Sequence, residues 1–304
     1  MSFSFETKNE ICKNKITKLC CKKGLAYGFL LFGKDFSSKS ISIQTENEET
    51  AKLYADMLAA VCNVYVDIKT RGHRKNTHKR VYLVDVPDKE QRLSVLKFFG
   101  HSKDDINVRI NFDNFTDECC VKSFVKGVFL ACGLISDPSR EYHLEFCTVH
   151  SRLSKDFSEL LNSLSLPPKT IIRKSSIILY YKESENIEDL LTIAGAPKKS
   201  MEIMNIKIYK EIKNTANRIT NCDTANIAKT VEASALQLKA IEKLKKVNEL
   251  EALPPELKEL AKLRTENPEL TLRELGQALK NPISRSGVNH RMKKIIEISD
   301  NLKI

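Results

Sequence analysis

The sequence lacks the features that mark membrane proteins, disulfide-bonded secreted proteins and zinc ribbons. No apolar run approaches the roughly eighteen residues that a membrane-spanning helix needs. The nine cysteines include the adjacent pairs Cys20-Cys21 and Cys119-Cys120 but no C-x-x-C pair, so no metal site is expected. Because no signal peptide is recognised, we expect a cytoplasmic protein with reduced thiols, mostly buried as small apolar groups.

Positive charge is in excess. The 304 residues include 50 lysines and arginines and 39 aspartates and glutamates, for a net charge of +11. This balance favours a polyanionic partner over an acidic substrate. The alternative is a solvated lysine-rich surface that binds no such partner. The length allows about two domains.

Residues 271–300 have the pattern of two helices around a short break. Thr271 and Glu274 fit a capping box, in which each side chain accepts a hydrogen bond from the other residue's backbone amide. The pair Asn281-Pro282 ends the first helix, because a residue before proline is disfavoured in the α region. Ser284 can cap the second helix. Helical spacing predicts that the following apolar residues pack the two helices together: Leu272, Leu275, Leu279, Val288, Met292 and Ile295.

The second of these helices has the charge pattern of a DNA recognition helix. No acidic residue occurs between Arg285 and Lys294. In a helix-turn-helix the second helix enters the major groove, where donors such as those of Asn289 and His290 reach base edges and lysines contact phosphates. The alternative is a plain helical hairpin with a solvated basic face. The residues predicted to bind DNA are Thr271, Ser284, Arg285, Ser286, Asn289, His290, Arg291, Lys293 and Lys294.

Residues 1–200 repeat one order of elements about 100 positions apart. Each half is predicted as helix, strand, helix, strand, strand, helix, and neither has a glycine-rich phosphate loop. The first half comprises a helix over 7–22 with Ile11, Ile16 and Leu19 as its apolar side, the apolar run 24–33, and residues 41–45, 48–61, 64–70, 79–86 and 88–99. The second half comprises residues 123–133, 142–148, 150–163, the strand pair TIIRK and SIILYYK, and residues 186–194.

The two apolar runs, LAYGFLLFG at 25–33 and VKGVFLACG at 125–133, resemble the LAGLIDADG motif of homing endonucleases. The resemblance implies that two such helices pack side by side at a pseudo-twofold axis. It also implies that the sheets on either side form a saddle over DNA. Small residues in both runs suit this close packing.

The acid that such an endonuclease needs at the eighth motif position is missing from both runs. Phe32 and Cys132 stand there, and leucines stand at the sixth positions. Phenylalanine and leucine cannot hold Mg²⁺, which requires oxygen ligands. Asp35 and Asp137 lie beyond the motif glycines at unequal offsets. We therefore expect no catalytic residues and no bound metal.

The segment 68–80, IKTRGHRKNTHKR, is the most basic of the chain and contains no acid. It falls at the predicted hairpin between the two strands of the first half. In the endonucleases that the motif resembles, this hairpin rims the DNA saddle, so phosphate contacts are expected. The alternative is a flexible solvated loop. The candidate phosphate contacts are Lys69, Arg71, Arg74, Lys75, Lys79 and Arg80.

A second resemblance is to the WhiA family of bacterial regulators. It rests on the pattern N-R-x-x-N-C-x-x-A-N-x-x-K-T-V from Asn217 to Val231 and on SRSGVNHR at 284–291. The resemblance covers essentially the whole chain. It implies a degenerate LAGLIDADG domain joined to a helix-turn-helix related to sigma-factor region four, in a regulator of cell division, chromosome segregation and sporulation. A polar helix cap and linker is the alternative interpretation of residues 217–231.

We therefore expect an α+β fold with a pseudo-twofold LAGLIDADG homing-endonuclease-like saddle followed by an all-α helix-turn-helix domain. The expected boundaries are 1–200 for the saddle (halves about 1–112 and 113–200), 201–220 for a helical linker and 221–304 for the helix-turn-helix domain. The expected function is sequence-specific transcriptional regulation on double-stranded DNA at the nucleoid, without enzymatic activity, cofactor or membrane. Two alternatives stay open: a scaffold whose saddle binds a sigma factor or another regulator, and an active metal-dependent endonuclease.

Overall fold

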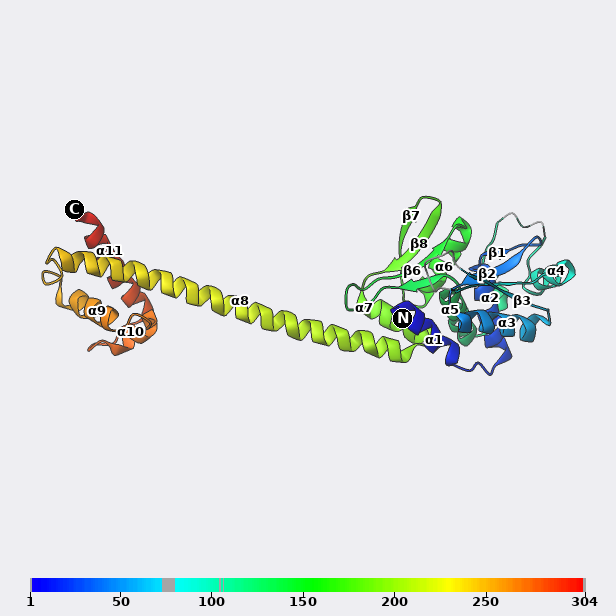
Figure 1. Cartoon of the computed structure of the whole chain (residues 1–304), viewed down its shortest axis with the longest axis horizontal. Coiled ribbons are helices and arrows are strands. Elements are labelled where there is room, and N and C mark those ends of the chain that lie inside the picture. The colour runs from blue at the N-terminus through cyan, green and yellow to red at the C-terminus, as the bar shows by residue number, and fades with distance from the viewer. Residues whose placement is uncertain (1, 73–79, 104, 106, 303–304) are drawn as a thin grey trace. The chain divides into compact units, whose positions relative to one another are not determined.

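The computed structural model describes residues 2–72, 80–103, 105 and 107–302 (Figure 1). Contacts between Cα atoms divide the chain into two units, Met1–Lys210 and Glu211–Ile304. Each unit has its own core of buried apolar side chains. Within the described ranges, no helix combines the length and the apolar character needed to cross a membrane.

The first half of unit 1 is an antiparallel sheet with helices packed against it. Its strand order is β1-β2-β4-β3. Ile41 and Ile43 alternate along β2 so that both side chains lie in the core. The elements of this half are α1 (Phe3–Lys13), α2 (Leu19–Leu31), β1 (Asp35–Phe36), β2 (Ile41–Thr45), α3 (Glu48–Cys62), β3 (Asp67–Gly72), β4 (Arg80–Asp85) and α4 (Lys89–Phe98).

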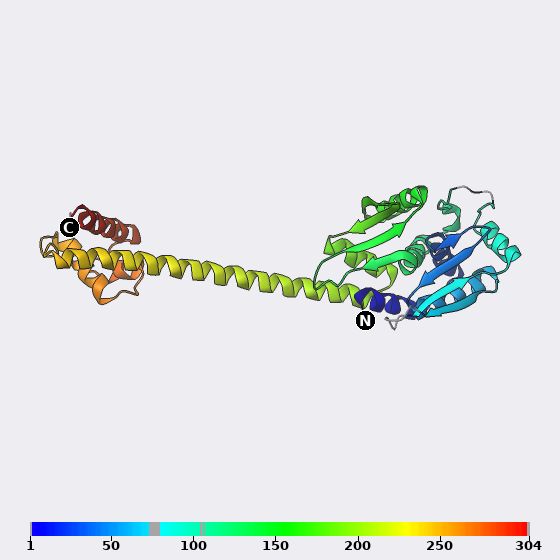
Figure 2. The ribbon, with the colours of Figure 1, turned by 45° about the horizontal axis from the view of Figure 1, so that its top comes forward.

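The second half of unit 1 repeats this arrangement. Its strand order, β5-β6-β8-β7, corresponds strand for strand to that of the first half. Figure 2 shows the two sheets side by side, one blue to cyan and one green. The predicted internal repeat is therefore confirmed. The elements are η1 (Phe112–Asn114), α5 (Glu118–Cys132), β5 (Gly133–Ile135), β6 (Leu144–Thr148), α6 (Ser151–Ser163), β7 (Lys169–Arg173), β8 (Ser176–Tyr181) and α7 (Ser184–Ala194).

The two motif helices, α2 and α5, pack against each other through their backbones. A Cβ atom on Gly28 would lie 2.3 Å from the Phe124 carbonyl oxygen, and one on Gly127 would lie 2.3 Å from the Leu25 carbonyl oxygen. No side chain larger than hydrogen fits at either position. The expected side-by-side packing of the two helices is confirmed, and it places them at the centre of the repeat.

The prediction of one helix over residues 7–22 is wrong. Helix α1 ends at Lys13, and a new helix, α2, starts at Leu19. Asn14 leaves the helix with an extended backbone, and its side-chain amide donates to the Gly195 carbonyl at 2.5 Å. Leu19 does not share the buried face of Ile11, because its side chain is 68% exposed. A contact made 181 positions away thus overrides the local apolar spacing.

Two short strands, β1 and β5, were not predicted. They have two and three residues, which is too short for an alternating pattern to be recognised. Each follows directly on a motif helix and pairs with the next strand of its sheet. Each is an edge strand of its sheet, and it begins near the C-terminal end of the motif helix that precedes it.

The rest of the chain is helical: α8 (Pro197–Lys246), α9 (Pro255–Glu266), α10 (Leu272–Ala278) and α11 (Arg285–Asn301). Helix α8 includes residues of both units, so the division at Lys210 falls inside it. Residues 217–231 are helical throughout and lie inside α8, so they are not a helix cap, and their role as a linker stays a prediction. The expected domain boundaries near residues 200 and 220 stay predictions.

Candidate nucleic-acid interface

Helices α10 and α11 begin at the predicted caps. The Thr271 hydroxyl accepts a hydrogen bond from the Glu274 amide at 3.3 Å, and the Glu274 carboxylate accepts one from the Thr271 amide at 2.8 Å. The hydrogen bond from the Thr271 amide lowers the pKa of Glu274. The Ser284 hydroxyl accepts from the Gly287 amide at 3.3 Å. The predicted capping box and N-cap are confirmed.

The turn between α10 and α11 is held by a close backbone approach. The Ile283 amide donates to the Gly276 carbonyl at 3.1 Å, and a Cβ atom on Gly276 would lie 2.4 Å from the Ile283 carbonyl oxygen. Only glycine therefore fits in α10 at this position. Val288, Met292 and Ile295 of α11 are buried in the same core as Leu275 of α10, as the spacing predicts.

A buried arginine supports this pair of helices from α9. Arg264 is 1% exposed, and its Nη1 donates to the carbonyls of Pro268, at 3.3 Å, and of Leu270, at 2.6 Å. These bonds fix the segment that leads into α10. Sequence reasoning missed this residue, because the sequence alone does not show whether the side chain of a helical arginine is exposed or buried.

The outer face of α11 is exposed and basic. Its residues fall into two rows at four-residue spacing, which lie on one side of a helix. Within the described part of the chain, no ion pair involves Arg285, Lys293 or Lys294. The exposed residues of this face are Arg285, Asn289 and Lys293 in one row, and Ser286, His290 and Lys294 in the other.

Arg291 differs from the other predicted contacts. Its side chain is 23% exposed, and it forms a 2.6 Å ion pair with Glu256 of α9. It therefore holds α11 against α9 rather than extending from the outer face. Thr271 and Ser284 are likewise engaged at the starts of their helices. Thr271 therefore caps α10, Ser284 caps α11, and Arg291 holds α11 against α9.

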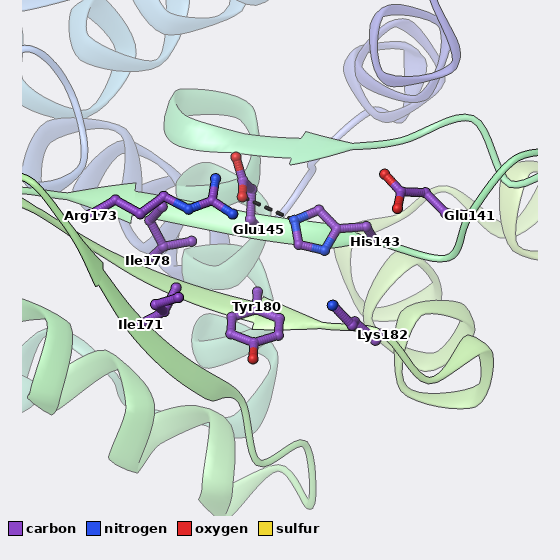
Figure 3. Close-up of a pocket in the computed structure, with 8 residues that line it drawn as sticks. All are labelled: Glu141, His143, Glu145, Ile171, Arg173, Ile178, Tyr180 and Lys182. Carbon is purple, nitrogen blue, oxygen red and sulfur yellow. Dashed lines mark hydrogen bonds and ion pairs between the residues drawn. The ribbon is translucent and has the colours of Figure 1, made fainter.

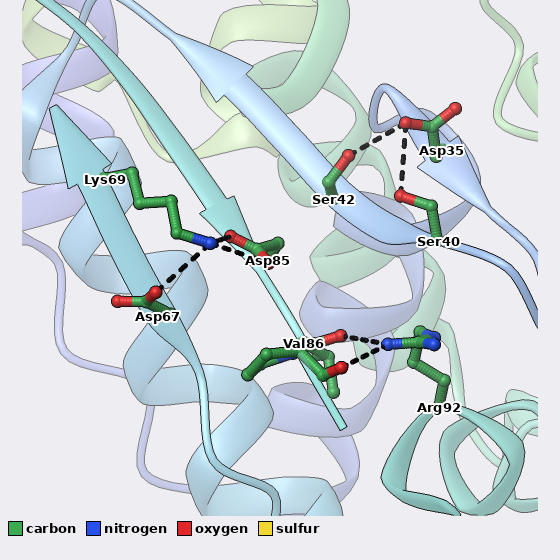
Figure 4. Close-up of polar contacts among 9 residues, drawn as sticks. Asp35, Ser40, Ser42, Asp67, Lys69, Asp85, Val86 and Arg92 are labelled. Carbon is green, nitrogen blue, oxygen red and sulfur yellow. Dashed lines mark hydrogen bonds and ion pairs between the residues drawn. The ribbon is translucent and has the colours of Figure 1, made fainter. Parts of the chain in front are cut away.

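Lys69, a predicted phosphate contact, is neutralised by acids on the same face of the first sheet. Its Nζ lies 3.2 Å from Asp67 and 3.2 Å from Asp85 (Figure 4). Hydrogen bonds to Asp85 and then Asp67 raise the pKa of Lys69. The alternation of Asp67 and Lys69 along one strand is a signal that could have revealed this pairing.

The other candidate phosphate contacts are only partly described. Arg71 and Arg80 lie at the ends of β3 and β4, and both are exposed. Arg74, Lys75 and Lys79 lie outside the described residues. Of the candidate phosphate contacts other than Lys69, Arg71 and Arg80 are therefore the two that the structure places at this edge of the first sheet.

The second sheet carries a depression of mixed charge on the face turned away from the core (Figure 3). His143 and Glu145 alternate with the buried Leu144 and Phe146, and His143 Nε2 lies 3.0 Å from Glu145 Oε2. Carboxylates at this surface oppose close approach of phosphates. The polar residues that line the depression are Glu141, His143, Glu145, Arg173, Tyr180 and Lys182.

The two aspartates beyond the motif helices have local roles. Asp35 accepts hydrogen bonds from the hydroxyls of Ser42, at 3.0 Å, and Ser40, at 3.3 Å (Figure 4). Asp137 accepts from the Ser139 hydroxyl at 2.7 Å, and this contact lowers the pKa of Asp137. Among the described residues, neither belongs to a group of side chains spaced to hold a metal ion.

The polar pattern at 217–231 lies on the surface of α8. All of these residues are exposed. Their side chains make local contacts: the Thr230 hydroxyl donates to the Asn226 carbonyl at 2.8 Å, and the Asn226 amide lies 3.6 Å from Cys222 Sγ. Their side chains are therefore available to a partner.

Known protein families match both parts of the chain. The family model for the WhiA C-terminal HTH domain matches residues 216–299, and that for the WhiA LAGLIDADG-like domain matches residues 121–213. The "Probable cell division protein WhiA" of Clostridium botulinum is 38% identical over 315 residues, which cover 100% of this chain and 99% of that protein. The protein of the same name from a Thermoanaerobacter species is 38% identical over 315 residues, covering 100% and 98%.

A solved structure has the same fold along the whole chain. The crystal structure of full-length WhiA from Thermatoga maritima has a TM-score of 0.61 and 23% sequence identity, with 100% of both chains covered. Together with the family models, this match confirms the expected fold class, a LAGLIDADG-like α+β part followed by an all-α helix-turn-helix part.

Proposed function

The chain belongs to the WhiA family, and on this basis we propose that it is a sequence-specific DNA-binding transcriptional regulator whose recognition helix is α11. The observation that carries the proposal is the outer face of α11. Two rows of exposed donors lie opposite a buried apolar face, and no acid interrupts them. Such a helix presents base-contacting groups in its first turns and phosphate-contacting cations further along.

The contacts divide by chemistry. Asn289 offers an amide that can pair with the major-groove edge of adenine, and Arg285 a guanidinium that can pair with guanine. Lys293 and Lys294 bind phosphates without distinguishing bases, and Ser286 and His290 lie beside them. Thr271 and Ser284 cap the starts of α10 and α11, and Arg291 keeps α11 in place through its ion pair with Glu256.

In the cell, we place this activity in cell division. The relatives that cover the whole chain are named as probable cell division proteins. Chromosome segregation and, where the organism sporulates, sporulation belong to the same proposal. The LAGLIDADG-like unit serves without nuclease chemistry, because Phe32 and Cys132, which offer no oxygen ligand for Mg²⁺, stand where the motif has its acids. It adds phosphate contacts through Arg71 and Arg80.

The proposal is tested by exchanging one base-contacting residue in the full chain. Asn289→Ala should relax sequence preference at one position of the binding site, at a cost of about 1–3 kcal/mol for the preferred sequence. Selection from a pool of genomic fragments, followed by binding measurements at fixed salt, reports both quantities.

The matched control is Asn301→Ala, at the other end of the same helix, which should leave the selected sequences unchanged. An unaltered preference in Asn289→Ala would show that α11 is not the recognition helix.

The second candidate is a scaffold whose sheets bind a sigma factor or another regulator. The acids on both sheets, Asp67 and Asp85 on one and Glu141 and Glu145 on the other, favour it, because they weaken attraction to phosphates. It predicts that charge changes on unit 1 leave DNA binding unaltered.

A further inference from the structure

The two adjacent cysteine pairs occupy the same place in the two halves of unit 1. Cys20 and Cys21 are the second and third residues of α2, and Cys119 and Cys120 are the second and third residues of α5. Because α2 and α5 pack side by side, the repeat brings the two pairs together. Two contacts show how close they are: Cys21 Sγ lies 3.7 Å from the Cys119 carbonyl oxygen, and a Cβ on Gly24 would lie 2.5 Å from the Cys120 carbonyl oxygen.

Four ligand atoms converge at this crossing. The Sγ atoms of Cys20, Cys119 and Cys120 and a carboxylate oxygen of Asp117 all lie within 4.8 Å of one another. In a tetrahedral zinc site with Zn–S bonds of about 2.3 Å, neighbouring sulfurs are about 3.8 Å apart. The distances between the ligand atoms therefore need to shorten slightly. Rotation of the partly buried Cys20 and Cys119 side chains and of the exposed Asp117 side chain can bring this about.

We propose that Cys20, Asp117, Cys119 and Cys120 form a structural zinc site that joins the two halves of the LAGLIDADG-like unit. Three thiolates and one carboxylate are a donor set that suits zinc, whereas Mg²⁺ and Ca²⁺ require oxygen ligands. Four protein ligands close the coordination sphere, so no position is open for a catalytic water.

Neighbouring groups orient the ligands. The Thr116 hydroxyl lies 3.1 Å from Asp117 Oδ2 and 3.4 Å from Cys120 Sγ, so it contacts two of the four ligands at once. The thiolates lie in the first turns of two helices, where free backbone amides stabilise negative charge. Cys21 points to a carbonyl oxygen instead and is outside the set.

The position of the site separates it from the nuclease chemistry of the motif. The ligands are at the N-terminal ends of α2 and α5, whereas Phe32 and Cys132 are at the C-terminal ends. At 1.5 Å per residue, twelve residues of helix separate the two ends by about 18 Å. The metal therefore stabilises the pairing of the two halves rather than acting at the saddle.

Cobalt titration of the full chain tests the site. The protein is purified under anaerobic, reducing conditions, stripped with a chelator and titrated with Co²⁺. We expect one equivalent to bind with thiolate charge-transfer and tetrahedral d–d absorption, and one equivalent of Zn²⁺ to displace it. Cys20→Ser and Cys120→Ser should each weaken metal binding by at least about tenfold, the smallest usual effect of losing even an outer-shell partner.

Two controls separate loss of a ligand from loss of the fold. Cys21→Ser removes a thiol from the same crossing but not from the ligand set, and it should bind Co²⁺ as the wild type does. Asp117→Asn changes an exposed side chain, so this variant should keep the fold while its affinity for the metal falls. Zinc should raise the melting temperature of the wild type more than that of Asp117→Asn. Absence of tetrahedral cobalt absorption in the wild type, or equal affinity in Cys20→Ser and Cys21→Ser, would overturn the proposal.

Discussion

At the scale of single residues, Phe32 shows what replaced the metal-binding acid of the motif. Its side chain is 6% exposed, and its ring centroid lies 4.9 Å from that of Phe157 and 6.3 Å from that of Phe124. An ionised carboxylate at this position would lose its water without gaining a partner. In the other half, burial raises the pKa of Cys132 to about 12, so the thiol stays protonated at neutral pH and is a poor metal ligand.

We predict from these two residues that the protein does not cut DNA. Supercoiled plasmid incubated with the full chain and Mg²⁺ or Mn²⁺ should remain intact, because no oxygen ligands stand at the motif positions. Gel electrophoresis over a time course measures this. Cleavage that disappears in Asp35→Asn but persists in Asp56→Asn, an exposed aspartate of α3, would contradict the prediction.

Sequence reasoning at this scale succeeded where the partner is a near neighbour. The caps at Thr271 and Ser284 were predictable, because the groups that they bind lie three residues away. Lys69 was taken for a phosphate contact because its second partner, Asp85, comes from the neighbouring strand. Arg264 was missed although its hydrogen-bond partners, Pro268 and Leu270, are near in the sequence, because the burial of its side chain depends on tertiary packing.

At the scale of elements, the pair α2–α5 depends on two glycines. The structure allows no Cβ at Gly127, which would lie 2.3 Å from the Leu25 carbonyl oxygen and 3.1 Å from the Phe29 amide nitrogen. Gly127→Ala must therefore push two buried helices apart. We expect a loss of about 1–3 kcal/mol or more of unfolding free energy, measured by denaturant titration.

The control for this prediction is Gly287→Ala in α11. A Cβ there meets side-chain atoms of Ile283 and Ser284 at ordinary distances of 3.4 to 3.6 Å. Because alanine favours a helix over glycine, stability should be unchanged or rise by up to about 1 kcal/mol. Equal stability of wild type and Gly127→Ala would mean that the two motif helices do not pack as described.

The order of elements was largely predictable from the repeat. Two occurrences of one pattern support each other, so the strands and helices of each half were recognised together. The division of residues 7–22 into two helices was not predictable, because Asn14 leaves α1 for a contact near residue 195. The cysteine cluster was missed because its ligands come from two helices about 100 positions apart, and no local spacing links them.

At the scale of the whole molecule, the net charge of +11 does not describe the surfaces that we propose contact DNA. On α11 the cations stand without acids among them. On the sheets of unit 1, Lys69 is paired with two aspartates, and Arg173 and Lys182 share a depression with Glu141 and Glu145. Among the predicted phosphate contacts that the structure describes, Arg71 and Arg80, at the β3–β4 edge, have exposed side chains, and Arg80 lies near Glu48.

The salt dependence of DNA binding measures how these surfaces contribute. Each phosphate contact adds about 0.9 to the slope of log K against log salt concentration. In the full chain, Lys293→Gln with Lys294→Gln should lower the slope by about 1.8, and Arg71→Gln with Arg80→Gln by a similar amount. Arg173→Gln with Lys182→Gln removes the same charge and should leave the slope unaltered, because acids beside these residues keep phosphates away. If the variant with Arg71→Gln and Arg80→Gln also keeps the wild-type slope, unit 1 does not contact DNA through this edge. Its surface is then free to bind a protein partner.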